Sequence, residues 1–137
     1  MVDEFWATTK TLDLPPGVYW PAKAPIAEPE VGSDGKLHGH SYEKGWGTAT
    51  AQTMWYCAWQ REWLSQFGHD NQRATTAYQK LLTFKSMDQY VLYSDQGTRD
   101  FVDSTLSKAA LGDPSLVQNN VNLNCHTVLP TVSSAAG

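Results

Sequence analysis

The sequence predicts an all-α domain: a small bundle of three longer helices and one short helix, with an N-terminal Pro/Gly-rich extended arm packed against it. Proline and glycine punctuate residues 1–47, and from residue 48 apolar residues recur with the period of a helix. Gly68 and Gly112 stand where helical patterns stop. At 137 residues, the chain has the length of one domain and can bury about two-thirds of the surface of its unfolded form.

Residues 1–47 are predicted to form an extended arm that belongs to the same domain as the helices. The stretch "LPPGVYWPAKAPIAEPE" separates apolar and aromatic side chains by prolines, which favour extended or polyproline backbone over helix. A tight turn at Ser33–Lys36 would allow a short hairpin between Val31 and Leu37. We therefore expect the arm to lie across the surface of the bundle.

The first helix is predicted from near Thr48 to Phe67. On a helical wheel, Trp55, Trp59 and Trp63 lie on one side of a broad apolar face, and Cys57 lies at its far boundary. Polar residues of the last turns occupy the remaining arc. The three tryptophans are therefore interpreted as core residues of an amphipathic helix, not as a separate binding stripe.

Three further helical patterns complete a predicted core of residues 48–126. The second pattern bends or breaks near Ser86, where its apolar residues move to another face. The third begins near Thr98, and the short fourth has Pro114 at its first helical position. The N-caps expected for the second and fourth helices are Asp70 or Asn71, and Asp113. Residues 127–137 are predicted to be a loose tail.

The charge pattern argues against two classes of partner. The formal net charge is -4, and no run of Lys or Arg is dense enough to attract a phosphate backbone, so nucleic acid is not expected. The longest apolar run is a few residues, which is too short to span a bilayer. The partner that remains is an unknown protein or a small-molecule ligand, and no cofactor is expected.

The two cysteines, Cys57 and Cys125, belong to no local metal-binding spacing. A disulfide between them would close a loop of roughly 70 residues and would require an oxidising compartment. The alternative is a pair of buried free thiols. The polar context "NNVNLNCH" around Cys125 offers little reason for a free thiol, which favours the disulfide.

His38 and His40 form the best candidate metal pair. In "LHGHSYE" the H-x-H spacing places both imidazoles on one side of an extended strand, with Glu43 close in sequence. A zinc site needs at least three protein ligands, and only His69 and His126 remain as further imidazoles. The alternative is two solvated histidines in a glycine-rich loop.

No catalytic residues are predicted. Ser41 beside His40 lacks the strand-turn-helix context of a nucleophile elbow. A thiol at Cys57 would lie in apolar surroundings that raise its pKa. Carboxylates near the start of the third helix are those expected to oppose a helix dipole in solvent. The chain is accordingly expected not to be an enzyme.

Aromatic residues of the arm are the candidate contacts for a ligand or partner. Tyr19, Trp20, Tyr42 and Trp46 lie there, and exposed Tyr and Trp are common in interfaces. The competing interpretation is that these side chains insert into the bundle and hold the arm in place. Adjacent side chains on an extended segment point opposite ways, so one of Tyr19 and Trp20 is expected to face outward.

The pieces "LPPGVYWP", "CAW", "GDPS" and a late "NC" together resemble small exported proteins of high-GC Gram-positive bacteria. That resemblance implies an extracytoplasmic location and carries no functional residue. We therefore expect a non-enzymatic extracytoplasmic domain, secreted or membrane-tethered, that acts by protein or ligand contact. The alternatives are a small-molecule or carbohydrate binder that uses the arm's aromatics, and a small metal-dependent protein or enzyme that uses His38 and His40.

Overall fold

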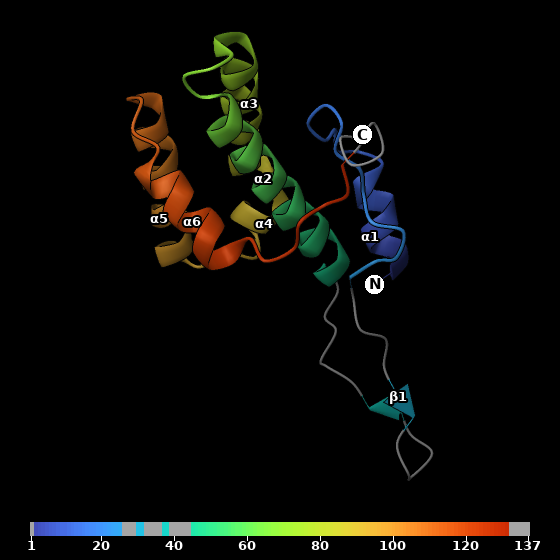
Figure 1. Cartoon of the computed structure of the whole chain (residues 1–137). Helices are drawn as coiled ribbons and strands as arrows, with labels where there is room; N and C mark the ends of the chain where they lie inside the picture. Colours follow the sequence, from blue (N-terminus) through green and yellow to red (C-terminus); the bar gives the residue numbers. More distant parts are fainter. Residues whose placement is uncertain (1, 26–29, 32–36, 39–44, 132–137) are drawn as a thin grey trace.

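Helix α2 lies at the centre of an all-α fold (Figure 1). The computed structural model describes residues 2–25, 30–31, 37–38 and 45–131. Helix α1 packs against α2 on one side, and α3 folds back along α2 after a short turn. Helices α4 and α6 also contact α2. Helix α5 packs against α3 and α6. The helices are α1 (Val2–Thr9), α2 (Trp46–Gln66), α3 (Asn71–Thr83), α4 (Asp88–Val91), α5 (Gln96–Ala110) and α6 (Ser115–Asn124), with a 3₁₀ helix η1 (Phe84–Ser86).

Two short strands complete the described elements. Strand β1 (Glu30–Val31) pairs antiparallel with β2 (Leu37–His38), in the register Glu30 with His38 and Val31 with Leu37. This pairing confirms the expected pairing of Val31 with Leu37, whereas the turn expected at Ser33–Lys36 lies outside the described residues.

The middle of α2 is buried on every side, which corrects the expected amphipathic helix. Every residue from Ala51 to Gln60 is buried except Thr53, which is half-buried. The polar arc exists only in the last turns, because α1, α3 and α6 together surround the middle turns. Two glutamines tolerate this burial because they are hydrogen-bonded: Gln52 Oε1 accepts from the backbone N–H of Gln89 at 2.8 Å, and Gln60 Oε1 accepts from Asn120 Nδ2 at 2.7 Å.

The three tryptophans of α2 are core residues, as predicted. Trp55, Trp59 and Trp63 are each no more than 3% exposed. Their indoles also hold the arm, since Nε1 of Trp55 and Nε1 of Trp59 both donate to the backbone carbonyl of Asp13, at 2.7 Å and 2.9 Å. A single carbonyl thus fixes the arm over α2.

The arm begins with a helix, α1, where extended backbone was expected for the whole of residues 1–47. Phe5 of α1 is fully buried and meets the Trp20 ring edge-on at 6.0 Å. The first fourteen residues contain no proline, and Asp3 and Glu4 stand in the first turn of α1, where carboxylates favour helix formation. The described residues from 12 to 25 contain no helix, as predicted.

Helix α1 also supplies the N-terminal cap of α2. Gly45, at the N-cap, adopts a left-handed backbone with φ of 101° and has no side chain to offer. The Glu4 carboxylate instead accepts from the backbone N–H of Thr48 at 2.8 Å and of Gly45 at 3.2 Å. Burial alone would raise the pKa of Glu4, but these two backbone hydrogen bonds lower it below its ordinary value.

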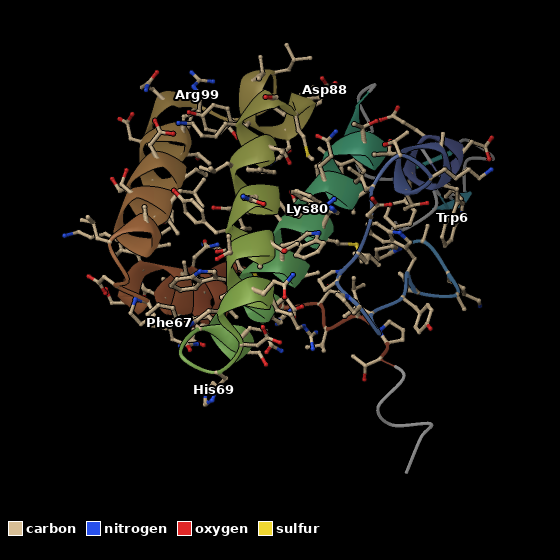
Figure 2. All side chains as sticks on the ribbon, turned by 90° about the horizontal axis from the view of Figure 1, so that it is seen from above. Trp6, Phe67, His69, Lys80, Asp88 and Arg99 are labelled. Atoms are coloured by element: carbon tan, nitrogen blue, oxygen red, sulfur yellow. A yellow bond between two sulfur atoms is a disulfide. The ribbon has the colours of Figure 1, made fainter. Side chains whose placement is uncertain are left out.

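A disulfide between Cys57 and Cys125 joins the middle of α2 to the end of α6, with a Cα–Cα distance of 5.6 Å. It is visible as a yellow bond in Figure 2. The Arg61 guanidinium donates to the carbonyls of Cys125 and Thr127. The disulfide reading of the sequence is therefore confirmed, and the free-thiol alternative is wrong.

Residues 125–131, which we call the C-terminal strap, cross α2 toward the arm (Figure 1). Leu129 is buried beside Phe5, and the backbone N–H of Tyr19 donates to the carbonyl of Pro130 at 2.9 Å. Val18 and Thr131 form an isolated antiparallel bridge. Residues 127–131 are thus held in place, which corrects the loose tail expected from residue 127; residues 132–137 lie outside the described residues.

The expected helix limits hold to within a few residues. Asp70 is the N-cap of α3 and accepts from the backbone N–H of Arg73 at 3.0 Å. The break expected near Ser86 is η1, followed by α4. Helix α5 starts earlier than Thr98 because Asp95, its N-cap, accepts from the Thr98 N–H at 2.8 Å.

Replacement of the cap at Glu4 tests its role. Glu4→Gln should lower the free energy of unfolding by about 1 kcal/mol at neutral pH. Because the folded pKa of Glu4 is depressed, its contribution is present above the ordinary glutamate pKa of about 4.3 and is lost as the pH falls through the folded value. Urea unfolding of both proteins from pH 7 to pH 3 should show their stabilities converging. Asp3→Asn, an equal change of charge on an exposed neighbour, should leave the pH profile unchanged; an equal loss in both variants would contradict the cap.

Removal of the disulfide should lower stability through the unfolded chain. The cysteines are 68 residues apart, so the double variant Cys57→Ala, Cys125→Ala should lose about 4 kcal/mol of unfolding free energy. Urea unfolding with and without reductant measures this loss. Reductant should destabilise the parent chain and leave the double variant unaffected. Two free thiols titrated in denatured, unreduced protein would rule the bridge out.

Candidate ligand-binding site

Two adjoining pockets lie along α2, and we call them together the α2 site. The larger has a volume of about 550 Å³ and the smaller about 300 Å³. They meet at Thr53 and Gln89, which line both. Besides these two, the larger pocket is lined by Tyr56, Cys57, Phe84, Ser94, Asp95, Gly97, Thr98, Phe101, Val102, Asn120 and Asn124, and the smaller by Pro25, Trp46, Ala49, Thr50, Met54 and Thr127.

Helical spacing explains why α2 contributes to both pockets. Trp46, Thr50, Thr53 and Cys57 recur every three or four residues and so lie along one face of the helix. Tyr56 stands ten positions after Trp46 in α2, so the two residues are about 15 Å apart along the helix axis. The larger pocket is closed by α4, α5 and α6. Gln89 of α4, Thr98 of α5, and Asn120 and Asn124 of α6 supply amide and hydroxyl groups.

Tyr56 is the most unusual residue of the site. Its side chain is 5% exposed, and its ring stacks on Phe84 with 4.0 Å between ring centroids. Within the described residues, its hydroxyl is the one buried side-chain polar atom without a hydrogen-bond partner. Burial, together with the charge of Asp103, raises the pKa of Tyr56 well above its ordinary value. The hydroxyl is therefore neutral, and it is itself covered from solvent.

The polar groups around Tyr56 are already ordered by bonds of their own. Ser94 Oγ donates to the carbonyl of Gln89 at 2.6 Å, and Asn124 Nδ2 donates to Asn120 Oδ1 at 2.7 Å. The backbone hydrogen bond from Thr98 lowers the pKa of Asp95, so this carboxylate is ionised at neutral pH. The lining thus offers preorganised amides, hydroxyls and one negative charge.

The structure brings one of the four predicted aromatic residues into the α2 site. Trp46 is 51% exposed and lines the smaller pocket. Tyr19 is 56% exposed on the arm and lines neither pocket, whereas Trp20 is half-buried against both core clusters. Tyr19 thus faces outward and Trp20 helps to hold the arm, as alternation along an extended segment predicts. Tyr42 lies outside the described residues.

The predicted metal pair is described only in part. The backbone of His38 belongs to β2, and His40 lies outside the described residues. His69 is exposed at the turn between α2 and α3 (Figure 2), and His126 is exposed in the strap. Across the residues that the structure describes, no three His, Cys, Asp or Glu side chains gather as metal ligands.

Sequence reasoning missed Tyr56, Gln89, Asn120 and Asn124 as site residues. Tyr56 was one more aromatic on an apolar face, and nothing in its spacing marks a hydroxyl without a partner. One available signal was Gln60, a polar residue inside an apolar stretch of helix, because burial there requires a polar partner from another element. That partner, Asn120, lines the larger pocket.

Comparison with known proteins adds no assignment. No protein family, curated protein or solved structure matches the chain. Among the described helices, none has both the length and the apolar character that crossing a membrane requires.

The unpartnered hydroxyl of Tyr56 predicts an unusual stability effect. Tyr56→Phe should raise the free energy of unfolding by about 1 kcal/mol, because it removes a buried group that has lost its bonds to water and gained none. Tyr90→Phe is the matched control, since the Tyr90 hydroxyl donates to Asp103 at 2.8 Å and its removal should not stabilise the fold. Urea unfolding of the three proteins measures both changes. A clear loss of stability in Tyr56→Phe would show that the hydroxyl is bonded.

Proposed function

We propose that this chain is a non-enzymatic extracytoplasmic domain, secreted or tethered to the outer face of a membrane, that acts by contact with a ligand or partner. The proposal places that contact at the α2 site. The observation that carries it is the Tyr56 hydroxyl, buried and without a partner at a pocket of about 550 Å³. Such a group costs about 1–3 kcal/mol of stability, and a ligand that displaced the atoms covering it and bonded to it would recover part of that cost.

The chemistry of the described lining supports binding over catalysis. It consists of apolar side chains, hydroxyls, amides and the single carboxylate of Asp95, whose geometry is committed to capping α5. Cys57 is held in the disulfide and offers no thiol. A nucleophile with an adjacent base, which covalent catalysis requires, has no counterpart among these described groups.

The disulfide supports the extracytoplasmic part of the proposal. Disulfides persist in oxidising compartments and are rare where thiols are kept reduced. Both sulfurs are held in buried residues of the core, which favours a structural bond over a transient one. A stable bridge of this kind suits a domain that works outside the cytoplasm.

A panel of small probes tests the α2 site. Isotope-labelled protein is titrated by NMR with single neutral oligosaccharides, sugar acids, amino acids, nucleosides and polyamines. We expect one class to shift the amide resonances of Thr53, Gln89 and Asn124. Thr98→Trp, at an exposed position of the larger pocket, should abolish that binding, while Thr75→Trp, at an exposed position of α3 outside the two pockets, should preserve it.

Two results would contradict the proposed site. One is that no class of the panel shifts these resonances. The other is that a class binds with equal affinity to Thr98→Trp and to Thr75→Trp, which would place the contact on another surface. Circular dichroism of both variants confirms that each is folded before titration.

A further inference from the structure

We propose that the ligand of the α2 site is a neutral oligosaccharide, with one sugar ring packed on Trp46 and another in the larger pocket beside Tyr56. This inference rests on the proposed function and names its ligand class.

The charges of the lining exclude anions. Among the described residues that line the two pockets, there is no Lys, Arg or His. The one charge is the Asp95 carboxylate at the N-terminus of α5, where it already accepts from the Thr98 N–H. The helix dipole would attract an anion to the N-terminus of α5, but the negative charge of Asp95 repels it there. Phosphates and carboxylates are therefore poor ligands, and a neutral molecule is favoured.

The polar groups of the larger pocket match a ligand with several hydroxyls. The Asp95 carboxylate only accepts hydrogen bonds, so the ligand must donate there. Asn124 Nδ2 is bonded to Asn120, which leaves the Asn124 carbonyl oxygen as a further acceptor. The Tyr56 hydroxyl can donate or accept once a ligand displaces the atoms that cover it. The hydroxyls of a sugar each donate and accept, so they suit acceptors such as Asp95 and Asn124 as well as a hydroxyl such as that of Tyr56.

Aromatic side chains complete this chemistry. Phe101, which is half-buried, lines the larger pocket beside its polar groups. Trp46 presents a half-exposed indole to the smaller pocket. The C–H face of a sugar ring is weakly positive and apolar, so it packs on the electron-rich face of an aromatic ring while its hydroxyls reach polar neighbours. Thr50 and Thr127 are such neighbours beside Trp46.

The separation of the pockets favours a chain of sugars over a single ring. Trp46 and Tyr56 are about 15 Å apart along α2. One sugar ring cannot contact both residues. The pockets meet at Thr53 and Gln89, so a linear ligand can pass from one to the other. Both linking side chains are polar and uncharged, as a neutral sugar requires.

Isothermal titration calorimetry with neutral tetrasaccharides tests the inference. The probes are maltotetraose, cellotetraose, mannotetraose and the N-acetylated chitotetraose, each with its monosaccharide. We expect at least one tetrasaccharide to bind, and its monosaccharide to bind about tenfold more weakly or not at all. Trp46→Ala and Tyr56→Phe should each weaken the tetrasaccharide by about fivefold to tenfold. Tyr19→Ala, which removes a similarly exposed aromatic outside the site, should leave affinity unchanged.

The outcomes separate this inference from the proposed function. If amino acids or polyamines bind at the α2 site and no tetrasaccharide does, the sugar inference is overturned and the binding site stands. If nothing binds at the α2 site, both are overturned. Equal loss of tetrasaccharide affinity in Trp46→Ala and Tyr19→Ala, or none in either, would also overturn the inference, because the sugar would then lie elsewhere. Tyr56→Phe remains informative, since the variant is expected to be at least as stable as the parent.

Discussion

The burial of the middle turns of α2 on every side is the constraint on which the rest of the structure depends. A helix without a solvent face must satisfy each polar side chain through its neighbours. Gln52 bonds the backbone of α4, and Gln60 bonds Asn120 of α6, so the two glutamines fix where those helices lie. The helix ends follow the same rule, since α1 supplies the carboxylate that caps the start of α2. The positions of α4 and α6, in turn, create the pockets beside α2.

Local patterns in the sequence predict much of this fold, and contacts between distant segments account for what they miss. The tryptophans of α2, the glycine after it and the N-cap at Asp70 act within a few residues, so their periodicity and chemistry suffice. The disulfide could be inferred because only two cysteines are present. Helix α1 was missed because the prolines farther along the arm dominated its composition. The candidate site was largely missed, apart from Trp46, because it is assembled from α2, η1, α4, α5 and α6, which no local pattern relates.

The α2 site and the core of the protein share residues, and this links binding to stability. Tyr56 stacks within the core and also lines the larger pocket, and Cys57 beside it carries the disulfide. A site built on such residues is rigid, which lowers the entropy lost when a ligand binds. The same placement leaves a polar atom of the core unpartnered, so the arrangement that suits a ligand is not the one that maximises stability.

The bridge between Val18 and Thr131 has a mechanical consequence when considered with the disulfide. Tension applied to the two ends of the described chain acts on α1, which Glu4 and the buried Phe5 hold to α2, and on the bridge and the Tyr19–Pro130 bond between arm and strap. Once these yield, the force reaches Cys57 and Cys125 and passes through their covalent bond. The residues between the two cysteines, which include α3, α5 and most of the larger pocket, bear no load. The disulfide therefore keeps these residues out of the path of a force applied at the ends of the domain.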